Sequence, residues 1–373
     1  MTGFVADSAG LYLHVPFCLS KCDYCGFYST PPQAGDIDRY LARLAEESAA
    51  TRARWPAAIS TVFVGGGNPT ASGFLVVRRL VEIIQTWCSP TPPLEITFET
   101  NPETLTAETV DFLASLPGVR LSIGVQRLDD AELALLGRHA RLDSVHRALD
   151  LACSRLKNVG IDLILGVPGC PSLTAALGGL LQRFGLQHVS AYFLTVEENT
   201  PMQKRIEAGL LPDPAEIGPE EMFAVRDLLV SNGFEHYEIS NYARPGRRCL
   251  HNLNYWQAGD YIGLGPSAVS CCGNRRSANP PDLQRWLHAE PQEVEMLSDT
   301  DRRNEFLMLN LRLLNDGLAL PALAARFGPQ PPEFEHAWLR QVSAGNLKQV
   351  GDRLLLTDQG LAVADQVLAS MFI

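Results

Sequence analysis

Six short apolar segments alternate with longer amphipathic segments along the first half of the chain. The expected strands are 11–15, 61–64, 95–100, 120–125, 160–165 and 189–194. The expected helices are 37–54, 73–87, 107–116, 130–136, 143–155 and 171–184, and the candidate N-caps of the first four are Asp36, Ser72, Thr106 and Asp129. Such alternation is typical of βα units around a parallel sheet. Six units predict an α/β fold with a partial (β/α)6 barrel, whose chemistry is expected at the carboxyl ends of the strands.

The second half of the chain has a weaker pattern. A helix is expected over 212–232, and the polar and aromatic segment 234–270 has no clear period. A proline-containing loop at 279–281 marks a boundary. Beyond about residue 298, short helices precede a strand–turn–strand pattern over 346–357 and a last helix. This order predicts a barrel with its extension over 1–290 and a small winged-helix-like C-terminal domain over 291–373.

The charge of the chain narrows the kinds of partner. Its 373 residues carry a formal net charge of −11. A winged-helix domain often binds nucleic acid, but binding to a phosphate backbone needs clustered Lys and Arg. We therefore expect no nucleic-acid partner and a packing or lid role for the C-terminal domain. The sequence has neither a run of about 18 apolar residues nor a signal-peptide pattern, which predicts a cytoplasmic protein.

Three of the nine cysteines lie close together, directly after the first expected strand. Cys18, Cys22 and Cys25 have Cys-x3-Cys-x2-Cys spacing, whereas the other six show no metal-ligand spacing. Three thiolates on one loop can each bind a corner iron of a [4Fe–4S] cluster. Because a fourth cysteine is missing, the fourth iron is open to the amino and carboxylate groups of S-adenosylmethionine (SAM). Electron transfer from the cluster would then cleave SAM to methionine and a 5′-deoxyadenosyl radical.

Two other interpretations of these cysteines are weaker. A zinc site usually has four ligands in paired Cys or His arrangements, and the chain has no second pair with that spacing. His14 is a conceivable fourth zinc ligand, but it lies inside the first expected strand. Chance clustering of structural cysteines does not explain their position directly after the first strand of a βα fold.

Further polar residues occur near the ends of the other expected strands. Glycines after the second strand let the backbone approach a ligand. Carboxylates and amides at strand ends can hold the ribose and methionine parts of SAM. Taken singly, each residue is better explained by a turn, a cap or a solvated position, but their shared place near strand ends favours a site. The residues are Gly65-Gly66-Gly67-Asn68, Glu99, Gln126, Asp162 and, after the next helix, Arg138, which can bind the carboxylate of SAM.

Several short motifs in a fixed order establish a resemblance that runs almost from end to end. They are Tyr12-Leu-His14-Val-Pro-Phe-Cys18, Gly65-Gly-Gly-Asn-Pro-Thr70, Ser122-Ile-Gly-Val-Gln126, Leu136-Gly-Arg138-His139, Asp162-Leu-Ile-Leu-Gly166-Val-Pro168, Tyr237-Glu-Ile-Ser-Asn-Tyr242 and His251-Asn-Leu-Asn-Tyr-Trp256. The chain resembles the radical SAM family that includes oxygen-independent coproporphyrinogen oxidase, and within it the haem-chaperone branch. The resemblance implies a radical SAM barrel with SAM contacts at Tyr12, Gly66, Gly67, Asn68, Glu99, Gln126, Arg138 and Asp162.

Two features distinguish the branches of this family. The oxidase branch has a longer segment ahead of its cluster, implicated in handling substrate and a second SAM. It also carries a further cysteine two residues after the third. Here 17 residues precede Cys18, and Phe27 occupies the extra position. Both features favour the chaperone branch over porphyrinogen decarboxylation.

The run from His251 to Trp256 is the feature that the chaperone branch associates with haem. His251 can ligate the iron, while Tyr255 and Trp256 offer flat apolar faces to the macrocycle. Cys249 is a second candidate ligand. The alternative is a structural aromatic segment that packs the open side of the barrel. The residues alone do not decide between these interpretations, and the resemblance favours haem.

The chain departs from the family pattern at two positions. Asn68 stands where the family usually has Thr or Ser, and Cys170 stands where it usually has Gln. Asparagine can still form hydrogen bonds, so SAM binding is expected to survive the first change. The second change leaves the local geometry open.

The resulting hypothesis is a haem chaperone of the radical SAM type that binds a [4Fe–4S] cluster, SAM and haem and delivers haem to a membrane-associated acceptor. The cluster and SAM would tune haem transfer or oligomeric state rather than drive fast turnover. A homo-oligomer is compatible with the sequence, although one chain reveals no interface. The alternative is an oxygen-independent coproporphyrinogen III oxidase, in which an adenosyl radical abstracts hydrogen from the reacting propionates and carbon dioxide is lost. A third hypothesis is a radical enzyme with another substrate. No catalytic residue is assigned.

Overall fold

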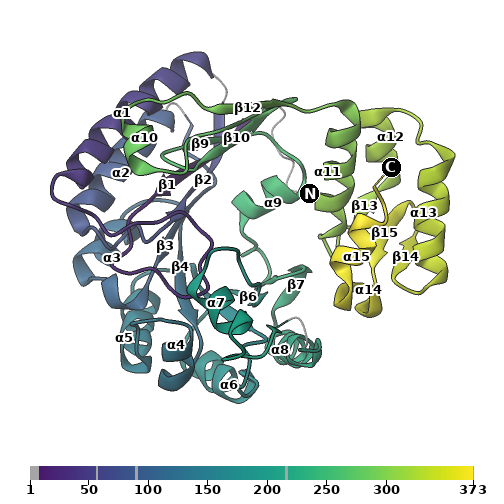
Figure 1. Cartoon of the computed structure of the whole chain (residues 1–373), viewed down its shortest axis with the longest axis horizontal. Helices are drawn as coiled ribbons and strands as arrows, with labels where there is room; N and C mark the ends of the chain where they lie inside the picture. Colours follow the sequence, from purple (N-terminus) through teal and green to yellow (C-terminus); the bar gives the residue numbers. More distant parts are fainter. Residues whose placement is uncertain (1–7, 56–57, 89–90, 215–216, 373) are drawn as a thin grey trace.

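The computed structural model describes residues 8–55, 58–88, 91–214 and 217–372. Within them, twelve strands form one curved sheet with helices on its outer face (Figure 1). The strand order is β12-β11-β10-β9-β1-β2-β3-β4-β5-β6-β8-β7. The two end strands are not neighbours in this order, so the barrel is partial, as predicted from the sequence.

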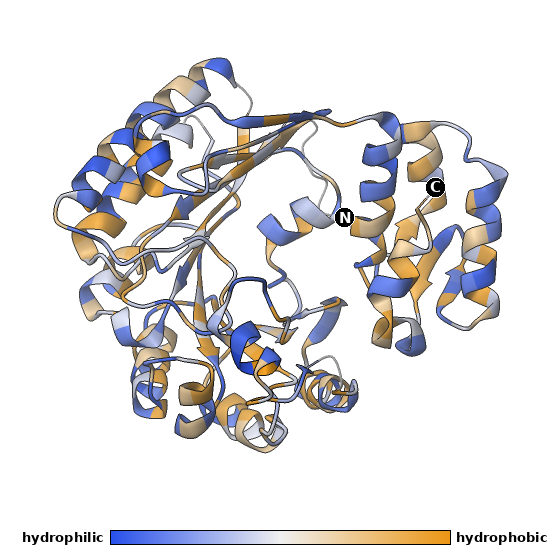
Figure 2. Ribbon diagram, viewed as in Figure 1, coloured by the Kyte–Doolittle hydropathy of each residue, from blue (hydrophilic) through white to orange (hydrophobic). Residues whose placement is uncertain are grey.

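The centre of the sheet consists of the six predicted strands. Each strand pairs in parallel with the next along the chain. Most of their residues are buried, because helices cover one face and the side chains of the other face fill the barrel. Figure 2 shows these strands largely in the orange of apolar residues. They are β1 (Ser8–Val15), β2 (Ala58–Gly66), β3 (Glu95–Thr100), β4 (Val119–Gln126), β5 (Val159–Leu165) and β6 (His188–Phe193).

Shorter strands extend the sheet at both edges. Beside β6 lie β8 (Asn241–Ala243) and β7 (Glu235–Glu238), both in antiparallel pairing. Beside β1 lies β9, which is parallel to it, and three antiparallel strands follow. Each added strand has three or four residues, too few for a clear alternation of apolar and polar residues. The strands beside β1 are β9 (Tyr261–Leu264), β10 (Val269–Cys272), β11 (Arg275–Ala278) and β12 (Glu293–Met296).

The helices of the barrel lie on the outside of the sheet (Figure 1). They follow the strands as the sequence predicts, with ends that differ by a few residues. A short 3-10 helix (Pro102–Thr104) precedes the third of them. The helices are α1 (Asp36–Arg54), α2 (Phe74–Trp87), α3 (Ala107–Ala114), α4 (Asp130–Leu135), α5 (Leu142–Cys153) and α6 (Thr174–Arg183).

Two of the four predicted helix caps are confirmed. The side chains of Thr106 and Asp129 accept backbone N–H groups at the starts of α3 and α4. The other two predictions are wrong, because glycines with positive φ precede α1 and α2. Asp36 is therefore the first residue inside α1, and Ser72 lies outside α2.

The helix predicted over 212–232 is shorter than expected and has an unpredicted neighbour. It forms α8 (Glu220–Ser231), and residues 215–216 lie outside the described residues. Before it comes α7 (Pro201–Glu207), capped by the side chain of Thr200. The segment without clear period contains α9 (Leu250–Trp256), which lies in the opening of the barrel (Figure 1). A short helix, α10 (Leu283–Leu287), packs against α1.

The C-terminal domain has its own core and a small antiparallel sheet. Helices precede the strand–turn–strand unit, in agreement with the predicted winged-helix-like arrangement. Its core includes Leu307, Leu323, Leu354 and Met371, all nearly inaccessible to solvent. The elements are α11 (Asp299–Leu311), β13 (Leu318–Ala319), α12 (Leu320–Phe327), α13 (Pro332–Ser343), β14 (Leu347–Val350), β15 (Arg353–Leu356), α14 (Asp358–Ala362) and α15 (Ala364–Ala369).

The C-terminal domain is joined to the barrel by several contacts. Leu314 N–H donates to the carbonyl of Tyr237 at 3.1 Å, and the carboxylate of Glu238 lies 3.7 Å from Arg312. β12 still pairs with β11 although it lies after residue 290, and the predicted boundary at that residue stays a prediction.

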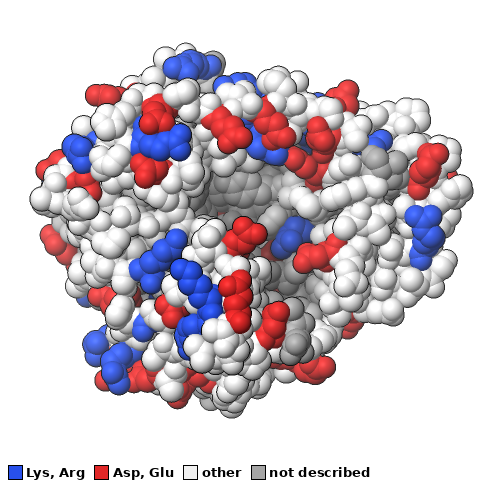
Figure 3. Space-filling view, viewed as in Figure 1, with Lys and Arg blue, Asp and Glu red and all other residues white. Residues whose placement is uncertain are grey.

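The surface in Figure 3 carries acidic and basic side chains around a central hollow. In the described part of the chain, no helix is long and apolar enough to cross a membrane.

Candidate metal and cofactor site

The loop after β1 brings the three clustered cysteines to the carboxyl end of the barrel. Its base is closed by two backbone hydrogen bonds, Cys18 N to Thr30 O at 3.2 Å and Thr30 N to Pro16 O at 2.7 Å. All three thiols are half-buried and line one cavity of about 430 Å³ inside the barrel. Gly26 lets the loop approach the opposite wall, since a Cβ there would lie 2.8 Å from Cγ of Glu197.

The chemistry of this loop fits a cluster better than a single metal ion. Among the described residues, no three Cys, His, Asp or Glu side chains converge closely enough to hold one ion. A cubane cluster has different needs, because it distributes its thiolate ligands over separate irons. Burial raises the pKa of Cys18 to about 11, so without a metal this thiol stays protonated. Iron binding therefore has to release protons from the loop.

The glycine segment at the end of β2 supports the cysteine loop. Gly67 N–H and Asn68 N–H donate to the carbonyls of Val15 and Phe17, both at 2.8 Å. A Cβ at Gly67 would lie 2.7 Å from each of these oxygens. Gly66 has φ 101°, a conformation that favours glycine. The glycines are thus required by close backbone contact with the loop, in addition to any contact with a ligand.

Two carboxyl groups form the acidic wall of the cavity. Ser122 Oγ donates to the carboxylate of Asp162 at 3.0 Å, and Gly66 N–H donates to Glu99 at 3.3 Å. Desolvation in the cavity wall, followed by the negative charge of Asp162, raises the pKa of Glu99 to about 8. Desolvation also raises the pKa of Asp162. Near neutral pH, Glu99 can therefore donate or accept a hydrogen bond, depending on the ligand.

Arg138 and Gln126 line the same cavity at the carboxyl end of β4. Arg138 donates to Asn101 Oδ1 at 3.1 Å and to the carbonyl of Gly124. Its Nη1 also lies 3.6 Å from Cys22 Sγ, and its buried Nε has no partner among the described residues. Gln126 has φ 67°, which is unusual for a residue with a side chain and interrupts the pairing of β4 with β5. Such strain is commonly found at binding sites.

The structure places most, but not all, of the predicted SAM residues on this cavity. Six of them line it: Gly66, Gly67, Glu99, Gln126, Arg138 and Asp162. Tyr12 is not part of the lining, and its hydroxyl is hydrogen-bonded to His14 Nδ1 at 3.0 Å. Asn68 is buried behind the glycine segment, where its side chain donates to Thr104 at 2.9 Å. Direct SAM contacts of Tyr12 and Asn68 stay predictions.

Sequence reasoning missed a central residue of the cavity, Arg120. It lies near the start of β4, is 2% exposed and lines the cavity. Its guanidinium forms no hydrogen bond or ion pair with the described residues. Burial alone would lower its pKa, but electrostatic interaction with nearby acidic side chains, Cys249 and Glu95 first, raises it on balance. The alternation of Arg120 and Ser122 with buried apolar residues in β4 is the signal that could have identified it.

The predicted haem residues on α9 do not line this cavity, and His251 is engaged in structural contacts. His251 is 1% exposed. Its Nδ1 is hydrogen-bonded to Thr61 Oγ1 at 2.9 Å and its Nε2 to Tyr255 Oη at 3.0 Å. Burial lowers the pKa of His251 to about 3, so the ring is neutral. In this conformation neither ring nitrogen is free to bind iron.

The other candidate haem residues are also engaged. Cys249 is fully buried, and its thiol donates to Glu95 at 3.5 Å. Glu95 also accepts the backbone N–H of Leu250 at 2.9 Å. The ring of Trp256 packs under Arg312, whose guanidinium carbon lies 4.4 Å from the ring centroid. Their roles in haem binding stay predictions.

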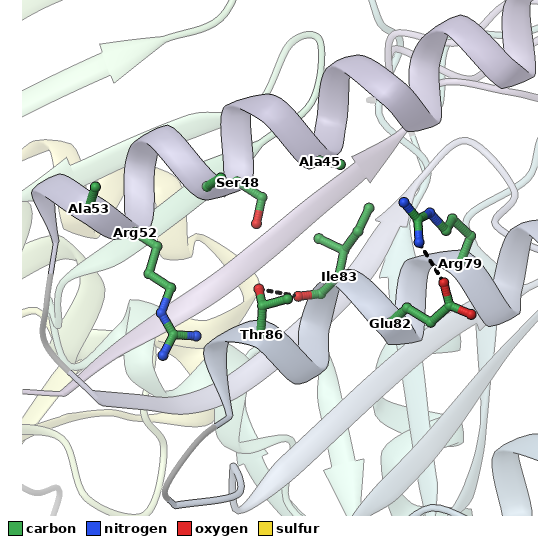
Figure 4. Close-up of a pocket in the computed structure, with 9 residues that line it drawn as sticks. Ala45, Ser48, Arg52, Ala53, Arg79, Glu82, Ile83 and Thr86 are labelled. Atoms are coloured by element: carbon green, nitrogen blue, oxygen red, sulfur yellow. Dashed lines mark hydrogen bonds and ion pairs between the residues drawn. The ribbon is translucent and has the colours of Figure 1, made fainter.

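A separate groove lies on the outside of the barrel between α1 and α2 (Figure 4). Its volume is about 540 Å³, and small residues of α1 such as Ala45 and Ala53 form one side. Arg79 and Glu82 form an ion pair of 2.7 Å at its edge. Its described lining contains no cysteine or histidine, so we do not associate it with the cofactor chemistry.

Comparisons with known proteins agree with the predicted family. Residues 12–170 match the Radical SAM superfamily, and residues 297–363 match the HemN C-terminal domain. The chain is 34% identical over 376 residues to "Heme chaperone HemW" of Mycobacterium tuberculosis, covering 97% of this chain and 94% of that protein. It is 35% identical over 324 residues to "Heme chaperone HemW" of Escherichia coli, covering 82% of each.

A solved structure agrees with the fold. Coproporphyrinogen III oxidase (HemN) of Escherichia coli, described as a radical SAM enzyme, has a TM-score of 0.82 to this chain. The match covers 98% of this chain and 90% of that chain at 19% identity, so it establishes the fold alone. The sequence relatives are closer and cover most of the chain. The protein therefore belongs to the radical SAM superfamily and, within it, to the HemW family.

Proposed function

We propose that this protein is a haem chaperone that binds a [4Fe–4S] cluster and SAM and delivers haem to an acceptor protein. Membership of the radical SAM superfamily implies the cluster and SAM. The observation that carries the haem part is the 34% identity to a protein named heme chaperone over 97% of the chain. The membrane association of the acceptor, self-association and a cytoplasmic location stay predictions.

In this proposal different residues of the barrel bind the cluster and SAM. Cys18, Cys22 and Cys25 hold the cluster, which together with SAM supplies one-electron chemistry when bound. Arg138 binds the carboxylate of SAM, because its guanidinium faces the cavity beside Cys22. Glu99 accepts hydrogen bonds from the ligand. The same cavity thus offers a cation to the carboxylate of a zwitterionic molecule and hydrogen-bonding carboxyl groups to its ammonium end.

Phe27 supports the chaperone over the oxidase. It stands where the oxidase branch carries an extra cysteine, and its side chain is 68% exposed beside the cysteine loop. An exposed phenylalanine can neither bind iron nor serve in proton transfer. The similarity of fold to coproporphyrinogen III oxidase does not by itself favour that activity, since one fold supports many functions.

The first measurement is an anaerobic haem titration of the reconstituted protein, followed by visible absorbance. We expect a saturable change of the Soret band. Absence of saturable binding in any form of the protein would exclude the chaperone, and decarboxylation of coproporphyrinogen III would then be measured.

The cluster assignment is tested separately by single cysteine substitutions. Cys22→Ala should lose the iron, the sulfide and the broad visible absorbance acquired on reconstitution, because it removes one of three thiolate ligands. Cys88→Ala, outside the loop, is the matched control and should retain them. Equal iron and sulfide contents in both variants would refute the assignment.

A further inference from the structure

A second and larger cavity lies at the opposite end of the barrel from the cysteine loop. Its volume is about 1100 Å³. The barrel contributes residues at the beginnings of its strands, such as Ser60 and Val119, and the C-terminal domain contributes Leu313 and Arg353. We call this cavity the lower cleft. It is large enough for a ligand of the size of a macrocycle.

Leucine side chains form much of the wall of the lower cleft. Leu116 and Leu156 come from the barrel, Leu313 comes from the C-terminal domain, and Leu250 and Leu253 come from α9. The same helix presents Asn252 to the cavity beside the cysteine loop, which we call the upper cavity. Helix α9 therefore separates the two cavities, and the family motif that it carries contributes to both. A flat apolar ligand can bury its faces against this wall at Leu116 and Leu250, which are partly exposed. Leu156, Leu253 and Leu313 are at most 8% exposed and form the base of the wall.

The charges around the lower cleft are unbalanced in favour of cations. Arg248 is paired with both Glu235 at 3.1 Å and Asp316 at 3.2 Å. Arg353, which donates to the backbone carbonyl of Asp316, supplies a second positive charge beside these two carboxylates. Lys157 and Arg247 also line the cleft. Within the described part of the chain, their side chains form no hydrogen bond or ion pair. Two cations without partners beside an apolar wall are suited to two carboxylates on an apolar ligand.

We propose that the lower cleft is the haem site, with the macrocycle against the leucines and the two propionates on Lys157 and Arg247. This inference rests on the proposed function. The described lining contains no His, Cys, Met or Tyr, so the cleft itself supplies none of the usual iron ligands. Haem is held by its ring and its carboxylates, and the iron is left open for a ligand from the acceptor.

The proposal is tested with three porphyrins and two double variants. The cleft variant is Lys157→Glu/Arg247→Glu, and its matched control is Arg54→Glu/Lys348→Glu, which makes the same change of net charge at exposed positions outside the cleft. The dissociation constants for haem, iron-free protoporphyrin IX and protoporphyrin IX dimethyl ester are measured with anaerobically reconstituted protein. Circular dichroism and the melting temperature verify that each variant folds.

We expect the cleft variant to bind haem and protoporphyrin IX at least about tenfold more weakly than the unmodified protein, because carboxylates replace both propionate partners. The control should differ by less than about twofold. The dimethyl ester should bind weakly to all three proteins, since it carries no propionate charge. If the charge reversal prevents folding, Lys157→Gln/Arg247→Gln replaces it, with a smaller loss in the same direction.

The outcomes separate this inference from the proposed function. Saturable haem binding with the same affinity in the cleft variant would overturn the lower cleft as the haem site while leaving the chaperone intact. No saturable binding by the unmodified protein would overturn both. A change of oligomeric state in the cleft variant with unchanged haem affinity would assign the cleft to contacts between copies and overturn its role in haem binding.

Discussion

Individual ionisable residues in the upper cavity have protonation states that follow from their burial. Glu99 and Asp162 lie on one wall, and desolvation raises the pKa of both. Arg120 stays charged below them without an ion-pair partner among the described residues. The ligand-free cavity is therefore electrostatically unfavourable, and a ligand that brings both an ammonium and a carboxylate group would relieve it.

The raised pKa of Glu99 predicts a dependence of stability on pH. Its pKa is 4.5 in the unfolded chain and about 8 in the folded protein. The folded state therefore holds a proton that the unfolded chain releases, and stability declines as the pH rises from 4.5 towards 8. Glu99→Gln should remove this component, at most about 1.4 kcal/mol per pH unit. Urea unfolding of the protein without cofactors between pH 5.5 and 8.5 measures it.

A surface substitution provides the control for this pH effect. Glu108→Gln in the exposed first turn of α3 should leave the pH dependence of the unmodified protein in place. Parallel stability curves for Glu99→Gln and the unmodified protein would contradict a buried carboxyl with a raised pKa.

At the level of elements, α9 is held in the barrel opening by buried polar contacts at its start. Glu95, at the beginning of β3, accepts backbone N–H groups of Leu250 and His251. The ring of His251 is hydrogen-bonded to Thr61 on β2. Since the helix has only seven residues, these tertiary contacts and not helix propensity determine its position.

These contacts predict a structural role for His251. His251→Ala should lower the free energy of unfolding by about 2–4 kcal/mol, because it leaves Thr61 and Tyr255 without a partner and opens a cavity. The affinity for haem should change by less than about twofold when measured at a temperature where the variant is folded. Chemical denaturation and haem titration give the two quantities.

His288→Ala, at an exposed position after α10, is the control and should affect neither quantity strongly. Loss of haem binding by His251→Ala with unchanged stability would instead identify His251 as an iron ligand.

At the level of the whole molecule, the barrel and the C-terminal domain share a small hydrophobic cluster. Leu313 is 1% exposed and packs with Tyr237, Ala243 and Leu253. The adjacent contact between Glu238 and Arg312 and the backbone bond from Leu314 reinforce this junction. We therefore expect the two parts to unfold together, and the lower cleft to depend on their relative position.

Shortening Leu313 tests this coupling. Leu313→Ala should lower the free energy of unfolding by about 2–4 kcal/mol, because a buried leucine at the junction is replaced by a cavity. Leu339→Ala, at a position that is 41% exposed on α13, is the control and should cost less than about 1 kcal/mol. Calorimetry of the unmodified protein should give one transition. Two separate transitions would show that the junction does not couple the parts.

Local patterns were sufficient to predict the central barrel and the cysteine loop. Apolar runs signal β1 to β6, because each strand is buried on both faces. The cysteines are recognisable because all three ligands come from a single short loop. Glu99 and Gln126 were predicted for the same reason, since parallel strands place their carboxyl ends at one edge, whereas Asp162 lies in the middle of β5.

The remaining features depend on contacts between distant parts of the chain, and only the folded structure reveals them. His251 meets Thr61 across 190 positions, and Cys249 meets Glu95 across 154. Hydrophobic periodicity along the chain does not reveal contacts between such distant residues. His251 and Cys249 therefore look like free ligands in the sequence but are buried and hydrogen-bonded in the structure. The lower cleft has the same origin, because its walls come from strand beginnings, α9 and the C-terminal domain. The amino-acid sequence specifies which side chains are present, but packing in the folded structure decides which of them remain accessible to a ligand.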